Sequence, residues 1–179
     1  MSCMKDNKKT GESTPTCSSA ATPSSTDTID LDNPDLYPPF STNGGLGSVP
    51  EPGGLYMIRE LDSDRAIMLD GGHLTLQRGI GTGGGWQWHC TQDREGWLGF
   101  RERVSGKYLG RDGKGGFCAK ASDFKSWEKF NIRPVKTGGY HILAIRWWTL
   151  LRMGIAGDSG ALIEVSPTTN CARWEFVEL

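Results

Sequence analysis

The feature that most limits the fold of this chain is a threefold internal repeat. Three segments of about forty residues line up when the chain is compared with itself, and each begins with a glycine before leucine or an aromatic residue: Gly54, Gly96 and Gly139. Each segment continues with a strand-like run ending in leucine, a turn rich in Gly and Asp, and a closing tryptophan. A repeat of this size cannot bury a hydrophobic face alone, so the three must share one core around a common axis.

Short apolar runs, broken by Gly and Asp turns about every ten residues, indicate about four short strands in each repeat. The predicted fold is therefore all-β, a β-trefoil with pseudo-threefold symmetry. Its repeats are expected at about residues 54–95, 96–137 and 138–179. The tryptophans that close the repeats are the expected fillers of the shared core, because large residues at equivalent positions fill a small barrel. They are Trp86 or Trp88, Trp127 and Trp174.

The composition divides the chain into a tail, residues 1–52, and a domain, residues 53–179. The tail is rich in Ser, Thr and Pro and has no periodic apolar pattern, so we expect it to be disordered. No apolar run has the length of a secretory signal or a bilayer span, which favours a cytoplasmic protein without a membrane span. The cysteines are odd in number and widely spaced, which favours neither a disulfide framework nor a zinc site. They are Cys3, Cys17, Cys90, Cys118 and Cys171.

The second repeat carries the sequence SGKYLGRDGKGGFCAKASDFKSWEKFNI from Ser105 to Ile132. It resembles the fascin-like repeat, in which a GKYL strand is followed by a glycine turn, a small residue and a W-E-x-F-x-I ending. The resemblance extends over Gly54 to Leu179 and implies a β-trefoil. In the best-known members of that family it also implies actin binding and filament bundling. Those bundlers carry several trefoils in one chain, whereas this sequence has one.

Charge is distributed unevenly along the chain. Residues 101–136 contain ten basic and four acidic residues, while the whole chain has a net charge of −1. A basic face attracts an acidic partner, so actin or another acidic protein surface is the expected partner of this non-catalytic module. No nucleic-acid partner is expected for a chain that is nearly neutral overall. The candidate partner-binding residues flank the RDGKGG turn and are Lys107, Arg111, Lys114 and Lys120.

Two other binding functions remain open. The first is a carbohydrate-binding, lectin-type trefoil. The chain carries WQW, SWEKF and RWEF where ricin-type lectins repeat a Q-x-W signature, so the resemblance to that family fails at its own signature. In a strand, the adjacent Trp147 and Trp148 should point to opposite faces, and an outward indole can stack on a sugar or on a protein partner. The second alternative is protease inhibition through an exposed loop.

The residues do not favour an enzyme. The motif GDSG at residues 157–160 resembles the surroundings of a serine nucleophile, and catalysis would need Ser159, a base such as His89 and a carboxylate such as Asp112. GDSG, however, occupies the turn position that the other repeats fill with DGG and DGKGG. The three histidines lie in different repeats without metal-ligand spacing. No catalytic residue, metal site or cofactor is expected.

Overall fold

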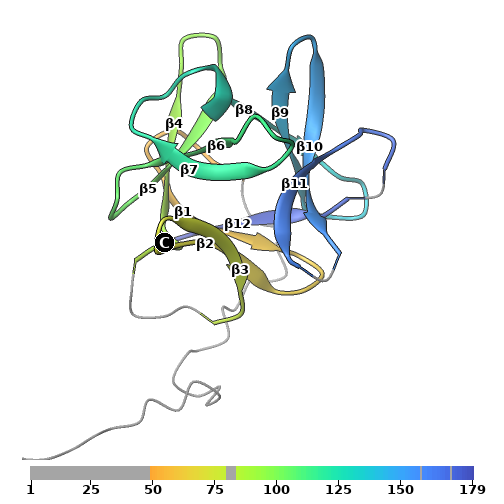
Figure 1. Ribbon diagram of the computed structural model, residues 1–179, viewed down its shortest axis with the longest axis horizontal. Coiled ribbons are helices and arrows are strands. Elements are labelled where there is room, and N and C mark those ends of the chain that lie inside the picture. Colours follow the sequence, from red (N-terminus) through yellow and green to blue (C-terminus); the bar gives the residue numbers. More distant parts are fainter. Residues whose placement is uncertain (1–48, 80–83, 158, 170) are drawn as a thin grey trace, which may run out of the picture. The chain divides into compact units, whose positions relative to one another are not determined.

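The computed structural model describes residues 49–79, 84–157, 159–169 and 171–179. The prediction of a disordered tail falls on residues 1–52, of which 1–48 lie outside the described residues. The described chain contains one 3-10 helix, η1 (Ser126–Glu128), and twelve strands (Figure 1). The strands are β1 (Leu55–Glu60), β2 (Arg65–Asp70), β3 (His73–Gln77), β4 (Trp88–Gln92), β5 (Leu98–Glu102), β6 (Tyr108–Arg111), β7 (Phe117–Ala121), β8 (Phe130–Pro134), β9 (Tyr140–Arg146), β10 (Thr149–Ala156), β11 (Ala161–Val165) and β12 (Trp174–Glu178).

Six of the strands close into an antiparallel barrel in the order β1, β4, β5, β8, β9, β12 and back to β1. The other six form three hairpins, β2–β3, β6–β7 and β10–β11. The second strands of these hairpins, β3, β7 and β11, contact one another and surround a common centre in Figure 1. Four strands, repeated three times, thus build a closed barrel with a hairpin cap, which confirms the predicted β-trefoil.

The core shows the threefold relation side chain by side chain. Three pairs of fully buried residues occupy equivalent positions: Ile67 with Trp88, Leu109 with Phe130, and Met153 with Trp174. The indole nitrogen of Trp88 donates to the Ile67 carbonyl at 3.0 Å, and that of Trp174 donates to the Met153 carbonyl at 3.2 Å. Each indole is therefore held by the same backbone group of its repeat, and its only polar atom is satisfied within the apolar core.

Trp127 does not fill the core, contrary to the prediction for the closing tryptophan of the second repeat. It lies in η1 with 49% of its surface exposed, and Phe130 takes the core position. The cause is local, because the Glu128 carboxylate accepts the Lys125 N–H at 3.0 Å and closes a tight turn before β8 begins. That turn directs the Trp127 side chain away from the barrel. Trp88 and Trp174 are buried as predicted.

The third repeat differs from the others in its first hairpin. β9 and β10 remain paired from Leu143 and Arg152 up to Arg146 and Thr149, which leaves a turn of two residues. In the first repeat the corresponding pairing ends at Glu60 and Arg65, before a longer turn. The β9–β10 hairpin consequently extends beyond the barrel, at the upper right in Figure 1.

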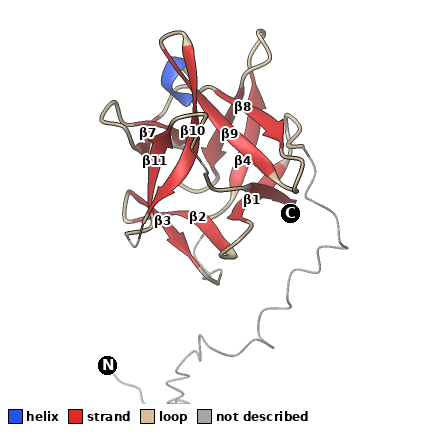
Figure 2. Cartoon of the chain, turned by 90° about the vertical axis from the view of Figure 1, so that its right-hand side faces the viewer, coloured by secondary structure: helices blue, strands red, loops and turns tan. Residues whose placement is uncertain are grey.

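The only helix in the described ranges, η1, is far too short to cross a bilayer. In Figure 2 this helix, coloured blue, lies beside the upper part of the β9–β10 hairpin, and η1 is in contact with β9. Two segments from different repeats thus form one edge of the domain.

Candidate functional site

The pseudo-threefold axis creates equivalent surface positions where the first turn of one repeat meets the hairpin of the repeat before it. Two of these positions are grooves. One has a volume of about 700 Å³ and lies between the first and second repeats. The other has a volume of about 750 Å³ and lies between the third and first repeats. Gly85 lines the groove between the first and second repeats, and Cys171 lines the groove between the third and first. Each lies three residues before the core tryptophan of its repeat, Trp88 or Trp174. At the third position Trp127 stands three residues before Phe130.

The groove between the first and second repeats, called here the apolar groove, is lined largely by Met68, Leu69, Val104, Ala119 and glycines. Two of the predicted partner-binding residues, Lys107 and Lys120, also line it. The ammonium group of Lys107 donates to the Ser122 hydroxyl at 2.8 Å, whereas Lys120 is exposed. The structure thus brings these two lysines to the same groove.

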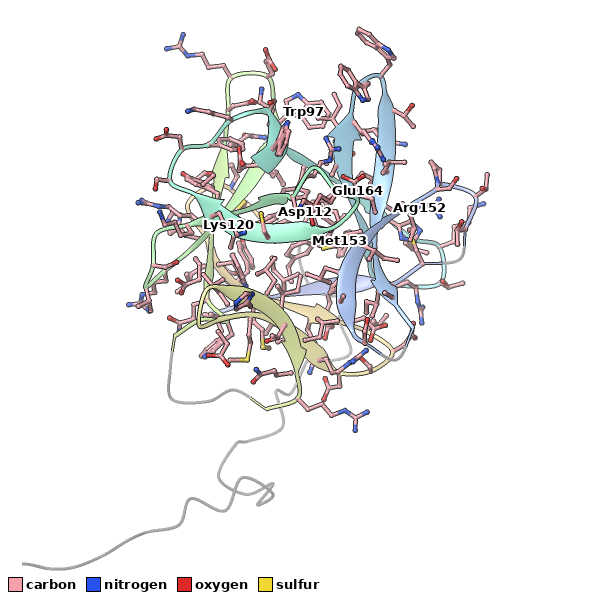
Figure 3. The ribbon with its side chains drawn as sticks, in the orientation of Figure 1. Trp97, Asp112, Lys120, Arg152, Met153 and Glu164 are labelled. Carbon is pink, nitrogen blue, oxygen red and sulfur yellow. The ribbon has the colours of Figure 1, made fainter. Side chains whose placement is uncertain are left out.

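The other two predicted residues lie elsewhere. Arg111 forms an ion pair with Glu164, donates to the Ile145 carbonyl at 3.0 Å, and has only 11% of its side chain exposed. Lys114 is exposed in the turn between β6 and β7 and does not line the apolar groove. In Figure 3, Lys120 lies to the left of Asp112, a residue of the β6–β7 turn. Glu164, the ion-pair partner of Arg111, lies to the right of Asp112. The four basic residues therefore do not form a single patch.

Arg111 belongs instead to a cluster that joins the second and third repeats. The Glu164 carboxylate, with 2% of its side chain exposed, binds Arg111 and also Arg146, the latter at 3.3 Å. The guanidinium carbon of Arg111 lies 5.9 Å from the centroid of the Trp127 ring. The two arginines share one carboxylate, which fixes Arg111 against the exposed indole.

The turn beyond Arg146 carries the two most exposed apolar side chains in the described ranges. Trp147 is 81% exposed and Trp148 is 96% exposed. Sequence alternation predicted one inward and one outward indole, but both point outward because they form the turn and not a strand. Trp147 has a φ angle of 55°, in the left-handed region that favours glycine. A backbone conformation of this kind costs about 1–3 kcal/mol and is common at binding sites.

A hollow of about 360 Å³ lies beside Trp127, lined by Ala121, Ser122, Asp123, Lys125, Ser126 and Glu128. On its other side the indole lies against Gly113, where a Cβ atom would come within 2.9 Å of Trp127 Cη2. Gly113 also has a φ of 76°, so this turn requires glycine twice over. We call the surface formed by Trp127, Trp147, Trp148, Arg111 and Arg146 the tryptophan face.

Two groups that a nucleophilic reaction would need, the Ser159 hydroxyl and the cysteine thiols, have local structural surroundings. The Ser159 hydroxyl donates to the Ala156 carbonyl at 3.1 Å within its own turn. Burial raises the pKa of the Cys90 thiol to about 12 and also raises the pKa of Cys118, so neither is a ready nucleophile. Within the described ranges, no three His, Cys, Asp or Glu side chains are grouped to hold a metal ion.

No protein-family model matches the chain, and no curated protein matches it either. Solved structures do. A designed threefold-symmetric protein, ThreeFoil, has a TM-score of 0.61 at 16% identity, and the match covers 70% of this chain and 99% of that one. The Macrolepiota procera ricin B-like lectin in complex with lactose has a TM-score of 0.51 at 18% identity, covering 74% and 91%.

A third solved structure is larger than this chain. It is a Clostridium perfringens endo-β-galactosidase that releases GlcNAcα1-4Gal, with a TM-score of 0.60 and 16% identity. The match covers 70% of this chain, which spans about a third of that enzyme, 32% of its length. At these identities the likeness shows the fold, a β-trefoil, and nothing finer.

Proposed function

We propose that this domain is a non-catalytic carbohydrate-binding module and that the tryptophan face contacts the sugar. The observation that carries the proposal is the exposure of Trp127, Trp147 and Trp148 around a fixed arginine pair. Exposed indoles in water are an unfavourable use of large apolar surfaces unless a partner covers them. A sugar ring offers an apolar C–H face for stacking and hydroxyl groups for hydrogen bonds.

The polar groups beside Trp127 can form hydrogen bonds with the hydroxyl groups of a sugar. The hollow next to this indole contains an exposed ion pair between Asp123 and Lys125, with its two charged atoms 3.1 Å apart. A carboxylate accepts hydrogen bonds from hydroxyl groups and an ammonium group donates to them. The hollow has a volume of about 360 Å³, at the lower end of the usual range for ligand pockets, which suits a single sugar ring.

The comparisons support a binding module of this kind. The Macrolepiota procera protein is a lectin solved with lactose, and it shares the fold over most of its length. The catalytic activity of the Clostridium perfringens enzyme is not carried over, because this chain spans only a third of it. Fold alone assigns no ligand, since trefoils support many unrelated functions.

Binding to actin or another acidic protein surface, as the fascin-like resemblance implies, is the second candidate. It is favoured by the basic side chains of the second repeat that remain exposed, Lys114 and Lys120. Arg111 contributes little to such a surface, because Glu164 neutralises it. Protease inhibition through an exposed loop stays a prediction.

A glycan array, followed by calorimetric titration of the best ligand, tests the proposed function. We expect binding by the wild type and a loss of at least about tenfold in affinity, or about 1.4 kcal/mol, for the double variant Trp147→Ala/Trp148→Ala. Leu179→Ala removes another exposed apolar side chain, which lies in neither groove, and serves as the control.

Two outcomes would decide against the tryptophan face. Either the wild type binds no glycan, or the double variant and Leu179→Ala bind equally well. Co-sedimentation with actin filaments at low and high salt, with Lys114→Glu/Lys120→Glu as the variant, tests the second candidate. Sedimentation that is lost in this variant and at high salt would establish an electrostatic actin contact.

A further inference from the structure

The groove between the third and first repeats, called here the basic groove, differs from the apolar groove in its charged lining. It is formed by the β1–β2 turn, β10 and the segment that precedes β12. In Figure 3 Arg152, one of its lining residues, lies on the side of the hairpin cap opposite Lys120. The titratable side chains that line the groove are Glu60, Asp62, Arg65, His141, Arg152, Cys171 and Arg173.

Some of these charges are already compensated. Arg173 forms an ion pair with Asp62 and donates to the Thr137 carbonyl at 2.9 Å. Glu60 is buried, and its carboxylate accepts the Ser63 N–H at 2.7 Å. These groups hold the β1–β2 turn in place.

Two arginines are not compensated. Within the described ranges neither Arg65 nor Arg152 forms an ion pair. Arg65 donates to the Ser63 hydroxyl at 2.8 Å. To the described residues Arg152 makes long contacts, 3.4 Å to the Thr169 carbonyl and 4.0 Å to the Cys171 sulfur. Arg152 is half-exposed, so its guanidinium group is accessible from the groove and keeps N–H groups free for an anion.

The threefold relation shows that the fold itself does not require basic residues here. Strand pairing places Arg152 opposite Leu143, as it places Ala66 opposite Arg59 and Tyr108 opposite Arg101. His141 precedes the buried Ile142, as Met57 precedes Ile58 and Gly99 precedes Phe100. Where the third repeat has Arg152, the first has Ala66 and the second has Tyr108. Where the third repeat has His141, the first has Met57 and the second has Gly99. This pair is specific to the third repeat.

The imidazole of His141 is a fixed part of the groove. Its Nδ1 lies 3.5 Å from the Cys171 sulfur. Burial lowers the pKa of His141, and the positive charges of Arg152 and Arg173 lower it further. A neutral imidazole adds no charge to the groove, so the positive charge there that no described carboxylate pairs with comes from Arg152 and Arg65.

We propose that the basic groove is a second binding site, which holds a compact oxyanion, a sulfate or carboxylate group carried by a small polar ligand such as an acidic sugar. Arg152 makes the main contact, because a guanidinium group without a carboxylate partner binds such anions through paired N–H groups. Arg65 is the second contact. The volume of about 750 Å³ leaves room for a ligand larger than the bare anion.

Calorimetric titration of the full chain at constant ionic strength tests this site. The probes are inorganic sulfate, glucose 6-sulfate, glucuronic acid and glucose. We expect saturable binding of an anionic probe, no binding of glucose at this site, and a loss of at least about tenfold in affinity for Arg152→Gln. Arg133→Gln is the matched control, because Arg133 is exposed on β8 and, among the described residues, its side chain bonds to that of Asn131 alone.

The anionic probes distinguish the two sources of the anion. Tighter binding of glucose 6-sulfate or glucuronic acid than of inorganic sulfate supports an acidic sugar, and equal binding of sulfate supports a site for the free anion. Arg65→Gln repeats the test should Arg152→Gln fail to fold. The proposal is overturned if no anion binds, or if both groove variants bind as tightly as Arg133→Gln. The double variant Trp147→Ala/Trp148→Ala should bind the anion normally, which separates this site from the proposed function.

Discussion

Arg111 on β6 and Glu164 on β11 form an ion pair that joins the second and third repeats. The backbone strengthens the same junction, since the Glu164 N–H donates to the Gly115 carbonyl at 2.8 Å and Gly116 pairs with Ile163. An arginine that the sequence marks as a surface contact is thus part of the framework that holds two repeats together.

Charge reversal at Arg111 should therefore destabilise the domain. Arg111→Glu places a second carboxylate beside the buried Glu164, and removing one partner of a buried pair costs about 3–5 kcal/mol. Lys114→Glu, three residues away and exposed, should change the free energy of unfolding by no more than about 0.5 kcal/mol. Urea denaturation of both variants measures the difference. Equal stability of the two would mean that the Arg111–Glu164 pair contributes nothing.

The core position of the second repeat can be tested with two aromatic residues. Phe130→Ala should cost about 3–5 kcal/mol, because the phenyl ring is fully buried among the barrel side chains. Trp127→Ala should cost about 1 kcal/mol, since it removes a half-exposed ring and its contact with Arg111. Thermal unfolding of the two variants gives the order. A Trp127→Ala variant less stable than Phe130→Ala would contradict the assignment of the core.

The backbone at the β9–β10 turn gives opposite expectations for neighbouring residues. Trp147→Gly relieves a left-handed conformation and should leave the domain as stable as the wild type, or more stable by up to about 1 kcal/mol. Trp148→Gly relieves no such strain and should lower stability by about 0.5–1 kcal/mol. Denaturant unfolding of the pair tests this, and the reverse order would mean that the turn is not strained at Trp147.

His141 should make stability depend on pH. Its pKa in the folded protein is lowered from the ordinary value of 6.5, so the unfolded chain binds more protons as the pH falls through that value. The free energy of unfolding should therefore decrease from about pH 7.5 to about pH 5, and His141→Gln should remove part of that decrease. His89→Gln, on an exposed residue of β4, is the control. An unchanged pH profile in His141→Gln would show that His141 does not contribute.

The repeat pattern in the sequence was sufficient to predict the fold, because a periodic signal reports directly on a shared core. Individual residues were harder to place. Trp127 and Phe130 are both aromatic and only three residues apart, and the choice between them depends on the turn that Glu128 closes with the Lys125 N–H. Side chain to backbone bonds of this kind leave no distinctive mark in a single sequence.

The candidate site was only partly predictable for a related reason. The partner of Arg111 is 53 residues away in another repeat, so local charge counting treats a neutralised arginine as a free one. The segment IRWWTL contains none of the Gly, Asn or Asp residues that announce a two-residue hairpin turn, and alternation along a strand was the natural expectation. The basic groove combines β2, β9 and β10 with the segment before β12, and only the folded chain brings these together.

The three equivalent positions around the pseudo-threefold axis bear on valency. One is apolar, one is basic and one carries tryptophan, so under the two proposals above the domain would offer chemically different sites. A branched ligand with a neutral and an acidic arm would bind its second site intramolecularly, and gains of 10²–10⁴ in avidity are typical of such linked binding. If two of these positions bind separate ligands, as proposed, one domain would bridge them, and a single trefoil would act as a crosslinker without a second copy of the fold.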